Sequence, residues 1–444
     1  MQLETQNSEL KRDISLYGLI MIAAGSSIGS GIFLTPQEIA STLPFPRLII
    51  IAWIIGGIVA LTGALTFAEL GAKFPKTGGV YVFLREAYGN TVAFMYGWVV
   101  LTVMTTGSLA ALGLGFAQYF CKLVGLSPDW YVLVGIFTIS FLTIINAFGV
   151  KISEIVAASL TTTKLIGIAI IIILGLFFIP VEVPVIELWQ PKNTENHNLI
   201  KGFAIALIGV LWSYGGWHHA SYLAGETKNP QKTVPKAMII GASIVAITYI
   251  LSNIAYHNLL SVEEIQNSST VAADAVSKIH ASGGFFISLL IAISIFGTTS
   301  IFTMSAPRIY FAMAKDGIFF KSLAKVNPYY KTPINAIVTQ SIIAIILLLF
   351  WQTFSNLITY VVFMDWVFMT LGAISIFIFR KRMKNATGYK TWGYPIIPLI
   401  FIIISVAFII TTSIFKPLQT LGGVVVLASG LLVFYFLKHW NKSQ

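Results

Sequence analysis

The sequence predicts an all-α polytopic membrane protein with twelve transmembrane helices, and three observations support this prediction. Of the 444 residues, 56% are hydrophobic and only 10% are charged, whereas a soluble domain has about 25% charged residues. Twelve windows of mostly apolar residues are long enough to cross a bilayer. The basic residues are unevenly shared between alternate connections, as the positive-inside rule describes. This composition excludes a soluble enzyme and a disordered scaffold, because neither keeps so much apolar surface from water.

Each window has about the 20 apolar residues that a transmembrane helix needs. The windows at 86–120 and 284–314 are longer, and they predict helices that tilt or extend beyond the bilayer. In chain order, the predicted spans are 15–41, 47–72, 86–120, 131–149, 153–179, 201–223, 235–259, 284–314, 333–351, 356–380, 395–416 and 419–438.

The net charge of +11 indicates an orientation in the membrane rather than a nucleic-acid partner. If residues 1–14 are cytoplasmic, 21 of the 28 lysines and arginines lie on the cytoplasmic side and 6 on the outer side. The remaining one, Lys164, lies within the fifth window. We therefore expect both termini, 1–14 and 439–444, in the cytoplasm, a lipid bilayer around the chain, and no nucleic acid.

Several kinds of chemistry lack the residues that they need. The single cysteine, Cys121, excludes an intramolecular disulfide and a metal site built from cysteines. No nucleotide-binding loop of Walker type is present, so transport driven by a gradient or by exchange is expected. His218 and His219 are adjacent, and neighbouring helical side chains point about 100° apart, which disfavours a shared metal. No catalytic constellation in the windows indicates an enzyme, and we expect no cofactor and no metal.

Two windows contain glycine-rich interruptions at similar depths. Residues 25–31 read GSSIGSG in the first window, and residues 213–217 read SYGGW in the sixth. Each helical glycine costs about 1 kcal/mol relative to alanine, and paired interruptions of this kind are typical of transporters built from inverted repeats. Five spans in each half, 15–179 and 201–380, place the second half in the opposite orientation. The alternative is that the small residues serve only as helix-packing faces.

An interrupted helix pair offers ligands for both ends of a zwitterion. Free N–H groups from Gly29 to Ile32 suit a carboxylate. Carbonyl groups from Ala24 to Ser26, and from Trp212 to Tyr214, suit an ammonium group or a cation. Such backbone is tolerated at membrane depth only where it lines a cavity or is buried in protein.

At these residues the chain resembles the amino acid–polyamine–organocation (APC) superfamily, and most closely its L-type amino acid transporter (LAT) branch. Residues 25–33 read GSSIGSGIF, similar to the family's first-helix motif. Residues 68–89 contain AELG and PKTGGVY, and residues 225–235 contain GETKNP followed by a proline. Residues 212–217, WSYGGW, are similar to the branch's sixth helix. The motifs occur in the family's order across most of the chain.

The resemblance implies a LeuT-type fold of two inverted five-helix repeats, with helices 1 and 6 broken and a peripheral helix pair at 395–438. It implies transport of L-amino acids across the plasma membrane by alternating access, as a sodium-independent exchanger of neutral amino acids. The alternative is a proton-coupled amino acid or polyamine symporter on the same fold. Animal members pair with a glycoprotein through an outer cysteine, and Cys121 lies near such a place. We nevertheless expect a bacterial inner-membrane protein without a heavy-chain subunit.

Two residues depart from the branch. Trp212 stands where an aromatic gate is usually Phe, and Asp365 stands where the branch often has Asn. A larger ring favours smaller substrates, and the carboxylate puts simple selectivity for neutral substrates in doubt. The expected substrate-binding residues are Ala24, Gly25, Ser26, Ser27, Gly29, Ser30, Gly31, Trp212, Ser213, Tyr214, Gly215, Trp217 and Asp365.

Lys164 and Asp365 are charges within predicted spans, where an unpaired charge costs about 3 kcal/mol or more. In the resembling family, a lysine at this place occupies the region where sodium-coupled relatives bind sodium. Thr298 and Thr299 are its candidate partners in the eighth span. Lys164 is interpreted as a sodium substitute, a proton carrier or a structural strut. Asp365 is interpreted as a substrate contact, a proton carrier, a partner for a buried cation, or an aspartate satisfied by neighbouring hydroxyls.

Overall fold

The computed structural model describes residues 10–178, 188–189, 198–350, 354–384 and 388–440, and the regular structure of these residues is helical. An isolated parallel bridge joins Ile14 to Thr227. In it, the Ile14 N–H donates to the Glu226 carbonyl (3.0 Å) and the Lys228 N–H donates to the Ile14 carbonyl (3.0 Å). Residues 1–9 and 441–444 of the predicted chain ends, and most of the connection at 180–200, lie outside the described residues.

Ten helical segments in the described residues are long and apolar enough to cross a membrane. The prediction of an all-helical, multi-pass membrane protein is therefore confirmed. The segments are α1 (Leu16–Ser27) with α2 (Gly31–Thr42), α3 (Pro46–Lys73), α5 (Asn90–Val99) with η1 (Val100–Met104) and α6 (Thr105–Val124), η2 (Pro128–Trp130) with α7 (Tyr131–Ala147), α8 (Val150–Phe177), α12 (Pro230–Leu259), α15 (Gly283–Ser305) with α16 (Pro307–Lys315), α18 (Phe354–Arg382), α19 (Ile396–Phe415) and α20 (Pro417–Trp440).

The other two predicted spans correspond to shorter apolar helices. They are α10 (Leu199–Tyr214) and α17 (Ile334–Phe350), of 16 and 17 residues. The prediction of twelve transmembrane helices stays a prediction. The remaining short helices are α4 (Val80–Tyr88), α11 (His219–Tyr222), η3 (Ala224–Glu226), α13 (Val262–Asn267), α14 (Val271–Ser277) and η4 (Lys321–Ala324).

The outer helices expose large apolar side chains. Phe137 on α7 is 68% exposed, Ile403 on α19 is 64% exposed and Leu432 on α20 is 75% exposed. Exposed apolar surface on this scale is unfavourable in water and is matched by lipid. The high hydrophobic content of the chain is therefore explained partly by these exposed faces, in addition to the buried core.

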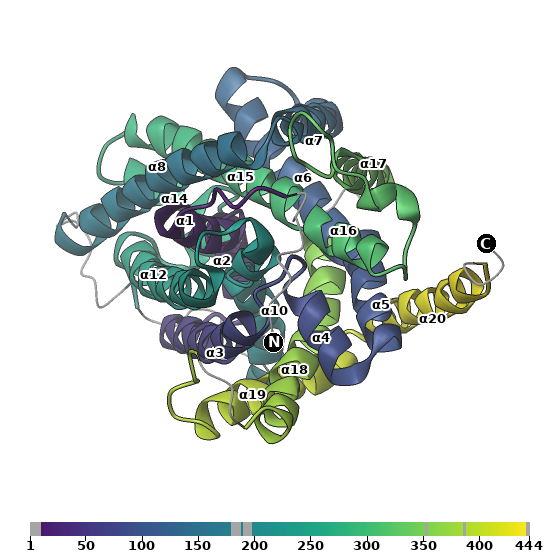
Figure 1. Ribbon diagram of the computed structural model, residues 1–444. Helices are drawn as coiled ribbons and strands as arrows, with labels where there is room; N and C mark the ends of the chain where they lie inside the picture. The colour runs from purple at the N-terminus through teal and green to yellow at the C-terminus, as the bar shows by residue number, and fades with distance from the viewer. Residues whose placement is uncertain (1–9, 179–187, 190–197, 351–353, 385–387, 441–444) are drawn as a thin grey trace.

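The broken helices occupy the middle of the bundle (Figure 1). Helix α1 packs against α12, α8 and α15, while α2 packs along α10. Helix α12 in turn packs along α3. Helices α19 and α20 lie at the rim, where α19 contacts α18 and α3 and α20 contacts α5. The helices at the two ends of the chain thus differ in position: α1 and α2 are enclosed by other helices, whereas α20 is peripheral.

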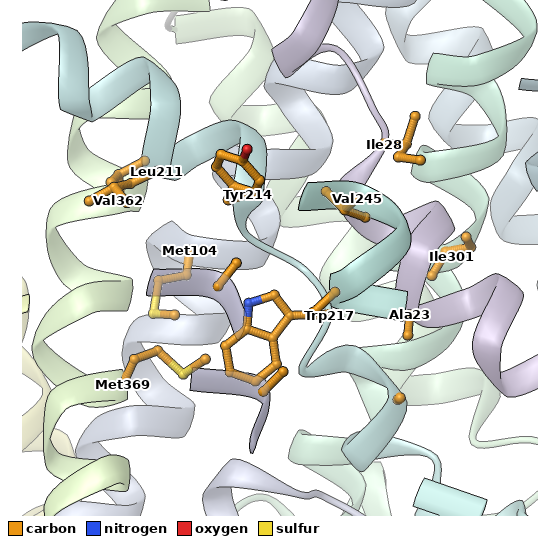
Figure 2. Close-up of a cluster of buried hydrophobic side chains, with 14 of the residues drawn as sticks. Ala23, Ile28, Met104, Leu211, Tyr214, Trp217, Val245, Ile301, Val362 and Met369 are labelled. Atoms are coloured by element: carbon orange, nitrogen blue, oxygen red, sulfur yellow. The ribbon is translucent and has the colours of Figure 1, made fainter. Parts of the chain in front are cut away.

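A buried apolar cluster anchors the segment that follows α10 (Figure 2). The Trp217 indole lies beside Met104 and Met369, and its ring meets the Phe67 ring edge-on with centroids 5.5 Å apart. Within a bilayer, close packing of such side chains stabilises the structure through van der Waals contact. Packing therefore fixes this irregular segment in the absence of helical hydrogen bonds.

The two helix interruptions touch each other. The first lies between Ser27 and Gly31, and the second lies between Tyr214 and His219. Gly216 has φ +113°, and a Cβ atom placed on it would lie 2.7 Å from the backbone carbonyl group of Ser26. A residue with a side chain is excluded there by both conformation and space. The glycines thus permit direct contact between two backbones.

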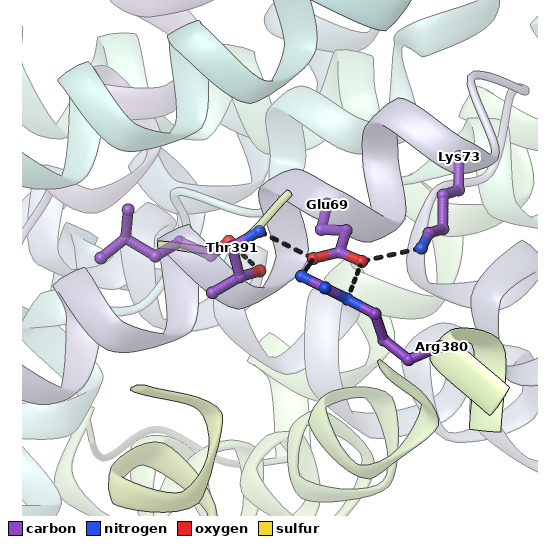
Figure 3. A network of polar contacts seen from close by, with 5 residues as sticks. Glu69, Lys73, Arg380 and Thr391 are labelled. Atoms are coloured by element: carbon purple, nitrogen blue, oxygen red, sulfur yellow. Dashed lines mark hydrogen bonds and ion pairs between the residues drawn. The ribbon is translucent and has the colours of Figure 1, made fainter. Parts of the chain in front are cut away.

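Two buried carboxylates tie helix ends together. Glu69 accepts hydrogen bonds from Arg380 (2.7 Å to each carboxylate oxygen), Lys73 (2.7 Å) and the Thr391 backbone N–H (2.7 Å), as Figure 3 shows. Glu226 is bound by Arg308 in the same bidentate manner, at 2.7 and 2.9 Å. Because charged hydrogen bonds satisfy both carboxylate groups, their burial is tolerated.

Candidate functional site

A cavity lies where the two helix interruptions meet α6, α15 and α18. Its walls combine polar groups with aromatic and aliphatic side chains, which is the usual composition of a small-molecule site. It is lined by Ser26, Ser27, Gly29, Ser30, Gly31, Met104, Thr105, Ser108, Leu112, Leu211, Trp212, Gly215, Gly216, His218, His219, Tyr222, Thr298, Phe302, Val361, Val362, Asp365 and Trp366.

The first interruption supplies backbone groups to this cavity. Helix α1 ends at Ser27 and α2 begins at Gly31. The first N–H groups of a helix have no acceptor within it and carry the positive end of the helix dipole. Gly29, Ser30 and Gly31 line the cavity at this helix start. The arrangement is suited to a carboxylate.

Hydrogen bonds hold the interruption in place from two sides. The Ser26 hydroxyl lies 2.8 Å from the carbonyl oxygen of Gly216, which belongs to the second interruption. The Tyr249 hydroxyl on α12 donates to the Ser27 carbonyl (2.7 Å). Carbonyl groups that leave the helical ladder are thus bound by other segments, as buried backbone requires.

Lys164 on α8 reaches the first interruption and is fully buried, at 1% exposed. Its ammonium group donates to the carbonyls of Gly25 (2.9 Å) and Ile28 (2.5 Å) and to the Thr298 hydroxyl (2.7 Å). An ammonium group has three donors, and all three have acceptors here. The lysine therefore joins α8, the α1–α2 break and α15 at one point.

The Thr298 hydroxyl completes this cluster. It lies 2.8 Å from both the Gly25 and the Ile28 carbonyl oxygens. Thr299, the other residue predicted as a partner, instead donates to the Ile295 carbonyl within α15 (2.8 Å). Thr298 is therefore the threonine that contacts Lys164.

The cavity lining also includes aromatic and polar groups from α10, α11 and α15. Trp212 on α10 and Phe302 on α15 both line the cavity. His219 packs on Phe302 with ring centroids 4.2 Å apart, and its Nδ1 lies 2.6 Å from the Ser305 hydroxyl. The Tyr222 hydroxyl lies 2.7 Å from the Tyr96 hydroxyl. The histidine pair is thus packed among rings and hydroxyl groups.

The structure brings many, though not all, of the predicted site residues to the cavity. Those that line it are Ser26, Ser27, Gly29, Ser30, Gly31, Trp212, Gly215, Asp365 and Thr298. Those outside the lining are Ala24, Gly25, Ser213, Tyr214, Trp217, Lys164 and Thr299.

The residues outside the lining have packing partners. The Tyr214 hydroxyl donates to the Trp53 carbonyl on α3 (2.9 Å). The Ser213 hydroxyl donates to the Gly209 carbonyl (2.8 Å). Binding of substrate by any of the predicted residues stays a prediction.

Sequence reasoning missed Thr105, Ser108 and Phe302, which come from α6 and α15. A run of small and hydroxyl-bearing residues, TTGS at 105–108, lies within an otherwise apolar helix directly after the π-helical turn η1. Such turns are frequent at functional sites. The polar run was visible in the sequence, but its position beside the two breaks required the fold.

In the part of the chain that the structure describes, no group of three or more His, Cys, Asp or Glu residues is arranged to hold a metal ion. Cys121 on α6 is buried and free.

Comparison with known proteins identifies relatives over almost the whole chain. Residues 14–436 match the family model described as amino acid permease. The chain is 33% identical to the serine/threonine exchanger SteT of Bacillus subtilis, with 99% of the chain and 100% of the relative covered. It is 31% identical to the mouse b(0,+)-type amino acid transporter 1, with 99% and 90% covered. It is 26% identical to the human cystine/glutamate transporter, with 98% and 87% covered.

Proposed function

The chain belongs to the amino acid permease family, within the APC superfamily and its L-type branch, and from this premise we propose that it is a sodium-independent exchanger of neutral L-amino acids. The family consists of transporters rather than enzymes, and the relatives are named as amino acid transporters and exchangers. The serine and threonine named for the Bacillus relative are the first substrates to test.

The observation that carries sodium independence is the set of contacts made by Lys164. Carbonyl and hydroxyl oxygens are the ligands that hard cations prefer. The ammonium group of Lys164 donates hydrogen bonds to the oxygens of Gly25, Ile28 and Thr298 at 2.5 to 2.9 Å. A fixed positive charge at these oxygens supports a transporter that needs no sodium ion there.

The cavity supports recognition of the amino acid backbone common to all substrates. The start of α2 at Gly29, Ser30 and Gly31 would bind the carboxylate. The lining from Ser26, Ser27 and Gly215 would meet the ammonium group. Trp212 and Phe302 would enclose the substrate and limit the size of its side chain.

The proposal includes the full LeuT-type architecture. It has twelve spans, two inverted repeats at 15–179 and 201–380, broken helices 1 and 6, and peripheral helices at 395–438. The interruptions after Ser27 and Tyr214 support it, since paired breaks at corresponding positions mark this class. The charge distribution supports cytoplasmic termini. The full-length match to a Bacillus protein supports a bacterial plasma membrane, and the proposal includes a chain that works without a heavy-chain subunit.

The test is transport by the purified chain alone in proteoliposomes loaded with unlabelled serine. Labelled serine should enter at least about tenfold faster into loaded than into empty vesicles. Replacing external sodium with choline should leave that rate unchanged. Equal rates in loaded and empty vesicles would refute exchange, and a requirement for sodium would refute the role given to Lys164.

Proton coupling is the second candidate, because Lys164 is buried among neutral oxygens and its described hydrogen-bond partners include no carboxylate. A buried lysine without a counter-charge is a type of group that can release and regain a proton during a transport cycle. In this case an inward proton gradient should accelerate uptake into empty vesicles. Abolition of that acceleration by a proton ionophore would favour the symporter over the exchanger.

A further inference from the structure

Three buried polar atoms around the cavity have no hydrogen-bond partner among the described residues. They are the Ser30 hydroxyl, Nδ1 of His218 and Oδ1 of Asp365. They come from the first interruption, the second interruption and α18, and all three residues line the same cavity. Buried polar atoms in proteins are nearly always paired. Unpaired atoms from three segments at one cavity therefore indicate groups kept for a ligand.

Resting on the proposed function, we propose that Asp365 is a specificity-determining residue that accepts a hydrogen bond from the side-chain hydroxyl of a short, neutral amino acid. In its ionised form a carboxylate only accepts hydrogen bonds, so the partner that it requires is a donor. Asp365 lies on α18, separate from the helix start that suits the substrate carboxylate. It is therefore positioned for the part of the substrate that varies between amino acids.

The surroundings of Asp365 limit what that donor can be. Val361, Val362 and Trp366 on the same helix also line the cavity and offer apolar contact. Leu211 of α10, a helix that packs against α18, also lines the cavity and adds apolar surface. A side chain that reaches Asp365 thus passes apolar groups and ends in one polar contact. A short hydroxylated side chain has this form.

Charge balance favours a hydroxyl over a cationic side chain. Lys164 and Asp365 are a basic and an acidic residue, and both lie in apolar helices around the breaks. A neutral amino acid leaves this pair balanced. A lysine-like or arginine-like substrate would add a positive charge near the buried ammonium group of Lys164, which is costly at low dielectric.

The test compares threonine with valine, which have nearly the same shape and differ by a hydroxyl in place of a methyl group. In proteoliposomes, the wild-type chain should exchange threonine with a KM about 10- to 100-fold lower than that for valine, as a hydrogen bond to a charged group provides. Asp365→Leu should reduce this ratio to within about threefold, chiefly by raising the KM for threonine. Asp365→Asn keeps a carbonyl acceptor and should retain an intermediate ratio.

Ser375→Ala is the matched control. It removes a polar group from the same helix, where the Ser375 hydroxyl donates to the Gly372 carbonyl (2.6 Å) outside the cavity lining. Its threonine-to-valine ratio should equal that of the wild type. If Asp365→Leu does not fold, Asp365→Asn carries the test, and an unchanged ratio in that variant overturns the proposal.

Three further results would overturn the proposal. Asp365→Leu with wild-type discrimination would show that another group reads the hydroxyl. Wild-type preference for arginine or lysine over threonine would show that the occupant is a cation. Unchanged discrimination in Asp365→Asn, with loss of uptake driven by a proton gradient, would assign Asp365 to proton transfer. By contrast, wild-type vesicles that exchange no amino acid at all would refute the proposed function itself.

Discussion

Lys164 and Asp365 are both charged residues within apolar helices, but their surroundings differ. Lys164 has three oxygen partners and lies outside the cavity lining. Asp365 lines the cavity and has a buried oxygen with no partner among the described residues. A charge whose partners are all supplied by the protein stabilises an arrangement of helices. A charge left without them is available to a ligand. The difference therefore assigns a structural role to Lys164 and a role in substrate selectivity to Asp365.

The largest expected effect is that of Lys164→Met, which removes the donor shared by two carbonyls and a hydroxyl. Each buried acceptor left unpaired costs about 1–3 kcal/mol, so the first helix interruption should lose its geometry. We expect exchange to fall about 100-fold, together with a lower thermal midpoint in detergent. Thr298→Ser keeps the hydroxyl and should remain near wild type in both measurements. Wild-type exchange by Lys164→Met would contradict the distinction drawn above.

Gly216→Ala tests whether the contact between the two interruptions is required. The new Cβ would lie 2.7 Å from Ser26 backbone atoms at φ +113°, so strain and overlap should together cost about 3 kcal/mol or more. Gly125→Ala is the control, because Gly125 has φ +74° but nothing within 4 Å of the added atom. It should cost about 1–2 kcal/mol. Thermal denaturation of both variants measures the difference, and equal losses would show that the contact is unimportant.

The Glu69→Gln variant tests how much a fully paired buried carboxylate contributes to stability, in contrast to Asp365. Glu69 is bound by Arg380, Lys73 and Thr391, whereas Asp365 has an unpaired oxygen. Removing the charge of Glu69 leaves the buried Lys73 ammonium group and the partly exposed Arg380 without their anion and should cost about 3 kcal/mol. Glu264→Gln on the exposed Lys278 pair is the control, for which we expect less than about 1 kcal/mol. A destabilisation no greater than that control would contradict the prediction.

The smallest expected effect is on the stability of Asp365→Leu. Replacing a buried carboxylate that has an unpaired oxygen with an apolar side chain should leave the free energy of unfolding unchanged or raise it by about 1 kcal/mol. The sign is therefore opposite to that for Lys164→Met and Glu69→Gln. Thermal midpoints of the three variants in one detergent check this order. Strong destabilisation by Asp365→Leu would show that the aspartate has a structural role.

The sequence was sufficient for the all-helical, multi-pass membrane class and for the position of the first helix interruption. Apolar windows and the glycines at 25–31 carry that information locally. The sequence also identified Lys164 as buried and needing partners, because a charge at that depth must be satisfied. It could not choose Thr298 over Thr299, since adjacent helical residues face different directions and the choice depends on how α15 is rotated.

Residues from other helices were beyond sequence reasoning. Ser108 and Phe302 reach the cavity only because α6 and α15 pack beside the breaks. Tyr214 and Trp217 show the converse: they flank the second interruption in sequence, but they turn toward α3 and pack against Trp53 and Phe67. Proximity along the chain therefore predicts backbone geometry better than it predicts the direction of a side chain.

The parallel bridge at Ile14 has a mechanical consequence. Both main-chain groups of Ile14, directly before α1, are bound to Glu226 and Lys228, which follow the second interruption. Glu226 is in turn held by Arg308 at the start of α16. A force applied to the chain before Ile14 is thus transmitted through the parallel bridge to both interrupted helices, and through the Glu226–Arg308 pair to α16. The segment before α1 and the segment after the second interruption are therefore coupled at this end of the molecule. They must move together, or else the two backbone hydrogen bonds of Ile14 must break.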